Sequence, residues 1–267
     1  MRKITNIGAS NFNPLLKHYL QERFLYRLSK STYKDNFMLK GGLLLITVDI
    51  PSSRPTMDID LLIHKLGNTK VMDAFKEILS IEYPDGVKFD ANSLQSEPIT
   101  KDGAYHGTRL KFKAYLNTSH NDMSIDLGLG DYVINPREIT FPTILNEDAP
   151  VLTAYSLETI VAEKLEAMVK LLYANSRMKD FYDVYTILNT HTLSGKTLAK
   201  AIKGTFEHRQ TPSNGLMRVF SPDFYDLPDK QIQWKAFLTK NKIVNVPSEF
   251  SHIVKGIEEK LHSLKII

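Results

Sequence analysis

The pattern of the chain is organised around the run Arg54-Pro55-Thr56-Met57-Asp58-Ile59-Asp60-Leu61-Leu62-Ile63. Apolar and acidic residues alternate at its centre, which predicts a β-strand whose successive side chains point to opposite faces. The apolar residues can then enter a core, while Asp58 and Asp60 share the other face with Cα atoms about 6.5 Å apart. Two such carboxylates suit a pair of divalent cations about 3.5–4 Å apart, as in phosphoryl and nucleotidyl transfer. The plainer alternative is a solvated strand edge that carries two acids.

A glycine pair precedes this strand, in Lys40-Gly41-Gly42 between two short apolar runs. Residues 36–39 are typical of a buried strand, whereas periodicity does not decide between strand and helix for residues 43–50. If the second run is a helix, Gly41 and Gly42 expose backbone N–H groups at its N-terminus, where a phosphate can bind. Glycine lets the backbone approach the anion closely. A Gly-Gly pair by itself is more often a turn.

A second acidic position lies in a predicted antiparallel hairpin. Residues 108–116 and 122–129 both alternate, and a polar segment joins them. In the second strand Ser124, Asp126 and Gly128 share the face opposite the apolar residues. An acid between small residues leaves room for a ligand, so Asp126 is a candidate for a third carboxylate near the metal or for a base toward an attacking hydroxyl. The alternative is an aspartate that faces solvent.

Composition places limits on the class of protein. With 267 residues and 42% hydrophobic residues the chain can form one large domain or two ordinary ones, and it has no cysteine. The N-terminus shows no signal peptide and no apolar run is long enough to span a membrane, so we expect a cytoplasmic protein without a membrane partner. A formal charge of +4 is compatible with a nucleic-acid partner. The segment 135–150 is rich in proline and polar residues and predicts a crossover between domains 1–150 and 151–267.

The pattern after residue 155 is helical. Ser156 is a candidate N-cap, and Lys164 falls on the apolar stripe of the helix that follows. An inward lysine is costly unless an anion meets it. Lys164 therefore binds a triphosphate, pairs with an acid or extends to the surface. Asp180 and Asp183 share one face of the next helix. They could hold Lys164, contribute to nucleotide binding, or serve as acids that the helix N-terminus favours.

Six motifs in order together resemble the AbiEii/AbiGii-type nucleotidyltransferase toxins of bacteria, over residues 35–190. They are Phe37-Met38-Leu39-Lys40-Gly41-Gly42, Arg54 to Leu61, Tyr105-His106-Gly107-Thr108-Arg109-Leu110, Ser124-Ile125-Asp126-Leu127-Gly128-Leu129-Gly130-Asp131, Ser156 to Leu165 and Arg177 to Asp183. The resemblance implies an α+β fold, with a polymerase-β-like nucleotidyltransferase mixed sheet followed by a helical C-terminal domain. It also implies a helical conformation for the run after Gly42.

For the site, the resemblance implies that Asp58 and Asp60 bind metal and that Lys164 and Asp180 have functional roles. We expect Mg²⁺ or Mn²⁺ as the metal, with Asp126 completing the site, and an NTP as substrate. The predicted nucleotide-binding residues are Lys40, Gly41, Gly42, Arg54, Thr56, Lys164, Arg177 and Asp183.

The resemblance further implies a toxin of a bacterial toxin–antitoxin pair that acts in phage defence, with a helix-turn-helix-type antitoxin as partner. The predicted reaction transfers NMP from NTP to the 3′ acceptor end of tRNA and stops translation. The alternatives are nucleotidylation or phosphorylation of a protein hydroxyl, the antitoxin being one candidate, and a non-catalytic nucleotide- or RNA-binding module. The segment 191–222 carries Lys196, Lys200, Lys203, Arg209 and Arg218, which form either a solvated face or a groove for RNA phosphates.

Overall fold

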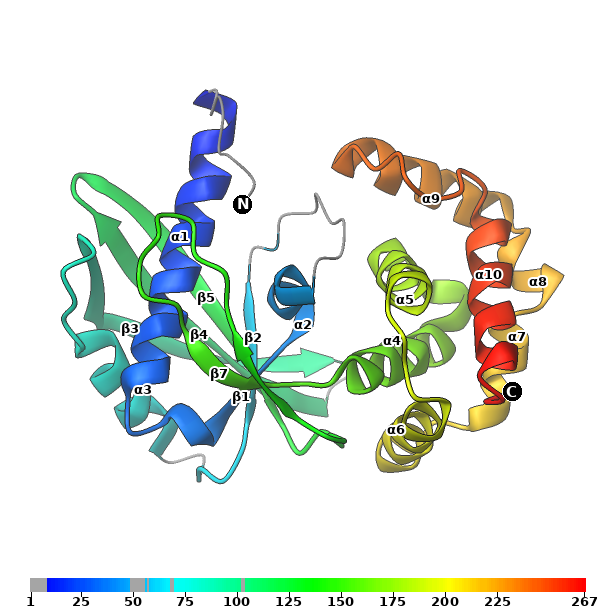
Figure 1. The fold of residues 1–267 in the computed structure, drawn as a ribbon, viewed down its shortest axis with the longest axis horizontal. Coiled ribbons are helices and arrows are strands. Elements are labelled where there is room, and N and C mark those ends of the chain that lie inside the picture. The colour runs from blue at the N-terminus through cyan, green and yellow to red at the C-terminus, as the bar shows by residue number, and fades with distance from the viewer. Residues whose placement is uncertain (1–8, 49–55, 57, 68–69, 102–103) are drawn as a thin grey trace. The chain divides into compact units, whose positions relative to one another are not determined.

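The computed structural model describes residues 9–48, 56, 58–67, 70–101 and 104–267, which include seven strands in one mixed sheet of order β3-β4-β5-β2-β1-β7-β6 (Figure 1). The pairs β1–β7 and β2–β5 are parallel, and the other neighbouring pairs are antiparallel. The strands are β1 (Phe37–Lys40), β2 (Ile59–Ile63), β3 (Val87–Lys101), β4 (Ala104–Leu116), β5 (Ser119–Leu129), β6 (Arg137–Thr140) and β7 (Val151–Ala154). The mixed sheet with many helices confirms the predicted fold class.

One face of the sheet is covered by α1 (Ala9–Lys30) and α3 (Val71–Ser80) (Figure 1). Phe24 of α1 is fully buried and its ring contacts those of Phe75, Phe89 and Phe112. Burial of a side chain of this size contributes about 1.5–3 kcal/mol. The Arg27 guanidinium reaches Asp85 with two hydrogen bonds of 2.8 and 3.0 Å. These contacts fix α1 to the segment that leads into β3.

The short segment between β1 and β2 is helical where the structure describes it. Helix α2 (Gly41–Leu44) begins directly after β1 and continues as a 3₁₀ turn over Leu45–Val48. The structure thus confirms the helical alternative for the apolar run that follows the glycine pair.

The second group of elements is entirely helical. It consists of α4 (Leu157–Leu171), α5 (Met178–Thr190), α6 (Gly195–His208), α7 (Leu216–Val219), α8 (Pro222–Tyr225), α9 (Pro228–Asn241) and α10 (Phe250–Ser263). Ser156 caps α4 as predicted, because its side chain accepts a hydrogen bond from the backbone N–H of Thr159. The core of this group is aromatic, with Phe250 in contact with Phe181 and Trp234.

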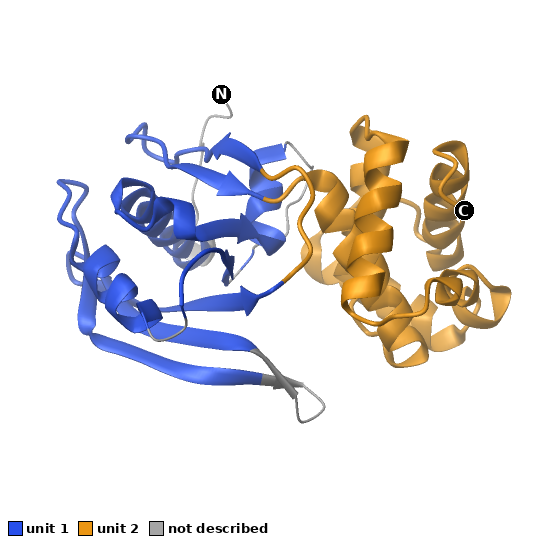
Figure 2. Cartoon of the chain, turned by 90° about the horizontal axis from the view of Figure 1, so that it is seen from below, with its two compact units in different colours: residues 1–48, 55–130, 137–154 blue, residues 49–54, 131–136, 155–267 orange. Residues whose placement is uncertain are grey.

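Contacts divide the chain into two compact units (Figure 2). The first comprises residues 1–48, 55–130 and 137–154, and the second comprises residues 49–54, 131–136 and 155–267. The division into a catalytic domain 1–150 and a helical domain 151–267 remains a prediction. None of the described helices is long and apolar enough to cross a membrane.

Two strands were not predicted. The crossover expected over residues 135–150 contains β6, and the first four residues of the expected helical domain form β7. Each strand has four residues, too few for a periodic signal, and its partner in the sheet supplies the backbone hydrogen bonds.

Candidate active site

The predicted carboxylates lie side by side on neighbouring strands. In the register of β2 and β5, Asp60 stands directly opposite Asp126, and Lys40 of β1 stands opposite Asp60 on its other side. Leu61 and Leu127, the next residues along each strand, are buried. Because strand side chains alternate between faces, the two aspartates occupy the face away from that core. The alternation of the sequence thus correctly predicts their common face.

Asp58 directly precedes β2 and belongs to the same face. Its carboxylate accepts a hydrogen bond from the hydroxyl of Ser124, two residues before Asp126 on β5. The sequence indicated Ser124 only as a small residue beside Asp126, so its contact with Asp58 is a new feature of the site. We call Asp58, Asp60 and Asp126 the acid face. Its three members are all partly accessible.

Gly41 is required where it stands because the backbone passes close to Asp60. Its φ of +69° lies in the left-handed region, which side chains disfavour. A Cβ built on Gly41 would lie 2.1 Å from Asp60 Oδ2. Gly42 follows as the second residue of α2. The glycine pair therefore allows the turn into α2 to approach the acid face.

Arg109 is the second unpredicted member of the site. It stands opposite Asp126 in the β4–β5 pair, and its Nε and Nη2 atoms each donate a 2.7 Å hydrogen bond to one carboxylate oxygen of Asp126. In the structure a two-residue turn joins β4 and β5, and counting back along both strands from this turn pairs Arg109 with Asp126. The sequence predicted a longer turn and therefore did not give this pairing. Asp126 thus lies between Asp60 on one neighbouring strand and Arg109 on the other.

The acid face has the donor chemistry of a site for Mg²⁺ or Mn²⁺, since these ions prefer carboxylate oxygens. Among the residues that the structure describes, however, no three acidic or histidine side chains converge closely enough to hold a metal ion. Asp58 meets Ser124, and both oxygens of Asp126 meet Arg109. The residues fit a divalent cation in kind, and Asp126 would have to exchange its partner to bind one.

Lys164 lies in a second group of charges, within the helical unit. Its ammonium is 2.7 Å from Asp180 Oδ1 and 2.8 Å from Asp183 Oδ2, and Arg177 Nε is 2.7 Å from Asp180 Oδ2. Both aspartates are fully buried and the Lys164 side chain is 13% exposed. We call these four residues the lysine cluster. Of the sequence-based alternatives, pairing of Lys164 with acids is the one observed.

Burial and charge oppose each other in this cluster. Burial disfavours the ammonium of Lys164, but Asp180 and Asp183 together outweigh it and raise the pKa of Lys164 above its ordinary value. Burial likewise disfavours the Asp180 carboxylate, but Lys164 and Arg177 lower the pKa of Asp180 below its ordinary value. Lys164 and Asp180 are therefore both ionised at neutral pH.

A family profile described as nucleotidyl transferase AbiEii toxin, type IV toxin–antitoxin system, matches residues 23–255. The chain belongs to the AbiEii family. This membership confirms the resemblance inferred from the motifs. A comparison with curated protein sequences found no match.

Two solved structures from Helicobacter pylori share the fold of this AbiEii-family protein. JHP933 has 14% sequence identity and a TM-score of 0.57, with 97% of each chain covered. A second protein, to which nucleotidyltransferase activity is ascribed, has 14% identity and a TM-score of 0.51, with 97% of this chain and 99% of its own chain covered. At this identity the similarity concerns the fold alone.

Three further residues of the AbiEii-family protein were predicted to bind the nucleotide. Thr56 donates a hydrogen bond of 3.5 Å to the Asp58 carbonyl, beside the acid face. Arg177 is the N-cap residue of α5. Arg54 lies outside the described residues.

The basic segment 191–222 is less positive than the sequence indicates. Arg209 is not available as a surface charge, because it lies within 3.0 Å of Asp131, Glu163 and Glu166. Sequence reasoning missed this group because its acids come from two distant segments. By contrast, Lys196, Lys200 and Lys203 are exposed on α6.

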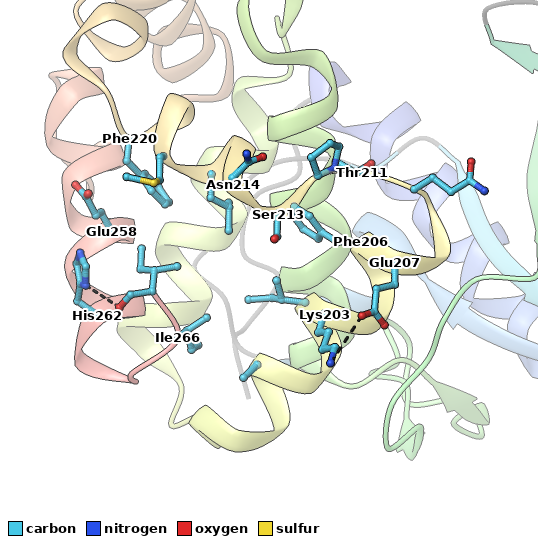
Figure 3. Close-up of a pocket in the computed structure, with 17 residues that line it drawn as sticks. Lys203, Phe206, Glu207, Thr211, Ser213, Asn214, Phe220, Glu258, His262 and Ile266 are labelled. Carbon is cyan, nitrogen blue, oxygen red and sulfur yellow. Dashed lines mark hydrogen bonds and ion pairs between the residues drawn. The ribbon is translucent and has the colours of Figure 1, made fainter.

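The helical unit also contains an apolar cavity of about 930 Å³ between α6, α7 and the end of α10 (Figure 3). Its apolar lining includes Ile202, Phe206, Leu216, Met217, Phe220 and Ile266. No member of the acid face or of the lysine cluster lines it. Its two acids, Glu207 and Glu258, do not belong to the acid face, so the size of the cavity does not make it the candidate active site.

Proposed function

We propose that this AbiEii-family protein is a divalent-metal-dependent nucleotidyltransferase that transfers NMP from an NTP to the 3′ end of tRNA and thereby blocks translation. The observation that supports the chemistry is the acid face, with Asp60 and Asp126 opposite each other on β2 and β5 and Asp58 beside them. The family profile supports a nucleotidyltransferase toxin of a toxin–antitoxin system.

In the proposed reaction a terminal ribose hydroxyl of the acceptor attacks the α-phosphorus of the NTP. A new P–O bond forms and the hydroxyl proton passes to water. The bond between the α-phosphorus and its bridging oxygen to the β-phosphate breaks, and pyrophosphate leaves with that oxygen. A divalent cation at the acid face would offset the negative charge that collects on the phosphates. Asp58, Asp60 and Asp126 would hold it, and the backbone at Gly41 and Gly42 would accommodate the triphosphate.

The lysine cluster is proposed as a second set of functional residues. An ammonium has three N–H donors, and among the described residues two of those of Lys164 are directed at Asp180 and Asp183. The third is then available to a phosphate oxygen. The surrounding acids would hold the ammonium in one position, which reduces the entropy lost when a ligand binds.

The exposed lysines of α6 are proposed to bind the acceptor. Lys196, Lys200 and Lys203 recur at helical spacing, so they share one side of α6. Contacts of this kind with phosphates weaken steeply as salt rises, with a slope of about −0.9 per contact on duplex DNA. An antitoxin partner follows from the family, and we propose that it carries a helix-turn-helix-type domain.

The decisive experiment incubates the purified protein with purified tRNA, Mg²⁺ and each labelled NTP in turn. We expect label on tRNA, at a rate that falls sharply between low and high salt. Asp60→Asn keeps the shape of the side chain but removes its charge, so it should reduce transfer by at least about 10²-fold. Asp122→Asn is the matched control, because Asp122 is an exposed aspartate on the same face of β5. It should transfer at the wild-type rate.

Three results would contradict the proposal. Transfer by Asp60→Asn at a rate close to wild type would exclude the acid face as the catalytic centre. Label on a protein of a cell lysate, with none on RNA, would replace tRNA by a protein hydroxyl as the acceptor. Unchanged transfer to tRNA by the triple variant of Lys196, Lys200 and Lys203 to Ala would exclude α6 as an acceptor-binding surface.

A further inference from the structure

Asp126 is held by two strong hydrogen bonds at the place where the proposed function requires a metal ligand. The guanidinium of Arg109 meets both carboxylate oxygens at 2.7 Å in a bidentate arrangement. Hydrogen bonds of this charge-assisted kind are the strongest that side chains make. The Arg109 side chain is 37% exposed and that of Asp126 is 23% exposed, so a solute can reach both groups.

The neighbouring charges explain why an arginine is stable there. The hydrogen bonds that Arg109 donates to the Asp126 carboxylate raise the pKa of Arg109 above its ordinary value. Partial burial opposes the rise, and the charges of Asp126, Asp58 and Glu97 add to it. Glu97 stands opposite Arg109 on β3. Arg109 thus lies among acids, and its positive charge offsets the repulsion within the acid face.

One carboxylate cannot give both oxygens to a guanidinium and also bind a cation fully. Asp126 can bind either Arg109 or a cation, and these two states lie on opposite sides of its strand, because β4 carries Arg109 on one side and β2 carries Asp60 on the other. A rotation of the Asp126 side chain would exchange the first partner for a cation shared with Asp60. The backbone of the sheet need not move.

We propose that Arg109 is the internal counter-ion of Asp126, that a divalent cation displaces it from this carboxylate, and that the released guanidinium then binds a phosphate of the nucleotide. The inference rests on the proposed function. Arginine suits the second role because its planar fork of N–H donors matches two phosphate oxygens as it matches two carboxylate oxygens. Arg109 is therefore both a competitor of the metal and a ligand of the substrate.

The proposal predicts opposite effects of one substitution on two ligands. Arg109→Gln removes the competing charge, so the affinity for Mn²⁺ without nucleotide should rise by about tenfold. With saturating Mn²⁺, the affinity for an NTP analogue with a methylene group between the α- and β-phosphates should fall by about tenfold. A tenfold change corresponds to about 1.4 kcal/mol, the size expected for a single charge-assisted contact. Free Mn²⁺ measured by electron paramagnetic resonance and analogue binding measured by calorimetry give the two constants without any turnover.

Two further variants act as controls. Lys111→Gln removes a cation two residues along the same strand, where it is paired with the exposed Glu97, and both affinities should stay at wild-type values. Arg109→Lys retains the charge but loses the bidentate geometry, so its Mn²⁺ affinity should lie between those of wild type and Arg109→Gln. Melting curves show whether each variant is folded. If Arg109→Gln does not fold, the affinities of Arg109→Lys test the proposal.

An Mn²⁺ affinity of Arg109→Gln that is equal to or below that of wild type would overturn the proposal. So would a rise in Mn²⁺ affinity without any loss of analogue affinity, since Arg109 would then have no part in nucleotide binding. A protein that shows both shifts but labels no acceptor would contradict the proposed function and leave the role of Arg109 supported.

Discussion

The acid face and the lysine cluster are made of the same chemical groups, but they balance charge differently. In the lysine cluster two cations meet two buried aspartates: Lys164 pairs with both of them and Arg177 with Asp180. In the acid face, among the residues that the structure describes, three aspartates lie beside two cations of the sheet, Arg109 and Lys40, and the aspartate side chains are partly accessible. A balanced buried cluster fixes a geometry. A surplus of accessible negative charge is the place where a bound cation would gain the most electrostatic energy.

The largest effect is expected when the balance of the lysine cluster is broken. Lys164→Met leaves Asp180 and Asp183 buried without their shared cation, and loss of one partner of a buried ion pair costs about 3–5 kcal/mol. Urea denaturation would measure this loss in the free energy of unfolding. Lys170→Met, an exposed lysine in the same helix, is the control and should change stability by less than about 0.5 kcal/mol. Similar losses for the two variants would mean that the cluster is no more than a surface ion pair.

The pH dependence sharpens the same comparison. In the wild type the pKa of Asp180 is lowered, so Asp180 stabilises the folded protein at every pH above the ordinary pKa of aspartate, about 3.9. This stabilisation is lost as pH falls through the pKa of Asp180 in the folded protein. Lys164 has a raised pKa, so its contribution is present below the ordinary pKa of lysine, about 10.4, and lost only as pH rises through its folded value. In Lys164→Met the buried carboxylates can bind protons, which removes the free-energy cost of burying unpaired negative charges. The difference in free energy of unfolding between the two proteins should therefore be largest from about pH 6 to 9 and shrink on acidification. Urea denaturation of both proteins at pH 4, 5, 6, 7 and 9 would measure it. A difference that stays constant over these pH values would contradict this account.

A smaller effect is expected at the glycine that touches the acid face. Gly41 and Gly130 have nearly the same positive φ, +69° and +72°, but a Cβ on Gly130 would have no neighbour within 4 Å. Gly130→Ala should cost about 1–2 kcal/mol through its backbone alone. Gly41→Ala should cost about 1–3 kcal/mol more, because the new methyl group meets Asp60, and it should also reduce Mn²⁺ affinity. Equal melting temperatures for the two variants would show that Asp60 adapts freely.

The smallest effect is expected outside both groups. The ion pair of Lys111 with Glu97 is about half exposed on each side, so Lys111→Ala should change the free energy of unfolding by no more than about 1 kcal/mol. Thermal denaturation at low and high salt would measure it. A loss as large as that of Lys164→Met would remove the distinction between buried and accessible charges on which the comparison depends.

The sequence predicts the members of the acid face better than their partners. Alternation alone assigns Asp58, Asp60 and Asp126 to a face, because a strand has a strict period of two. It does not state which strands are neighbours, and so it does not pair Asp60 with Asp126. The bidentate contact of Arg109 depends on the register of a hairpin, which a turn longer by a few residues would shift.

Other differences arise where packing overrides pattern. Ile232 belongs to an apolar pattern of α9, but it is 65% exposed while Trp234 of the same helix is fully buried. Arg209 has the composition of a surface residue, but acids from α4 and from the segment after β5 surround it. Both outcomes depend on contacts between segments far apart in the chain, which local periodicity does not contain.

The parallel pairing of β2 with β5 has a consequence for the order of folding. Asp58 and its partner Ser124 are 66 residues apart in the chain, whereas Lys164 and Asp180 are 16 apart. Contacts between distant residues form late, because the entropy of closing a long loop must be overcome first. A ribosome that is making the chain must therefore release all of β5 before the acid face can exist. Pulsed hydrogen exchange during refolding should accordingly protect the amides of α4 and α5 before those of β2.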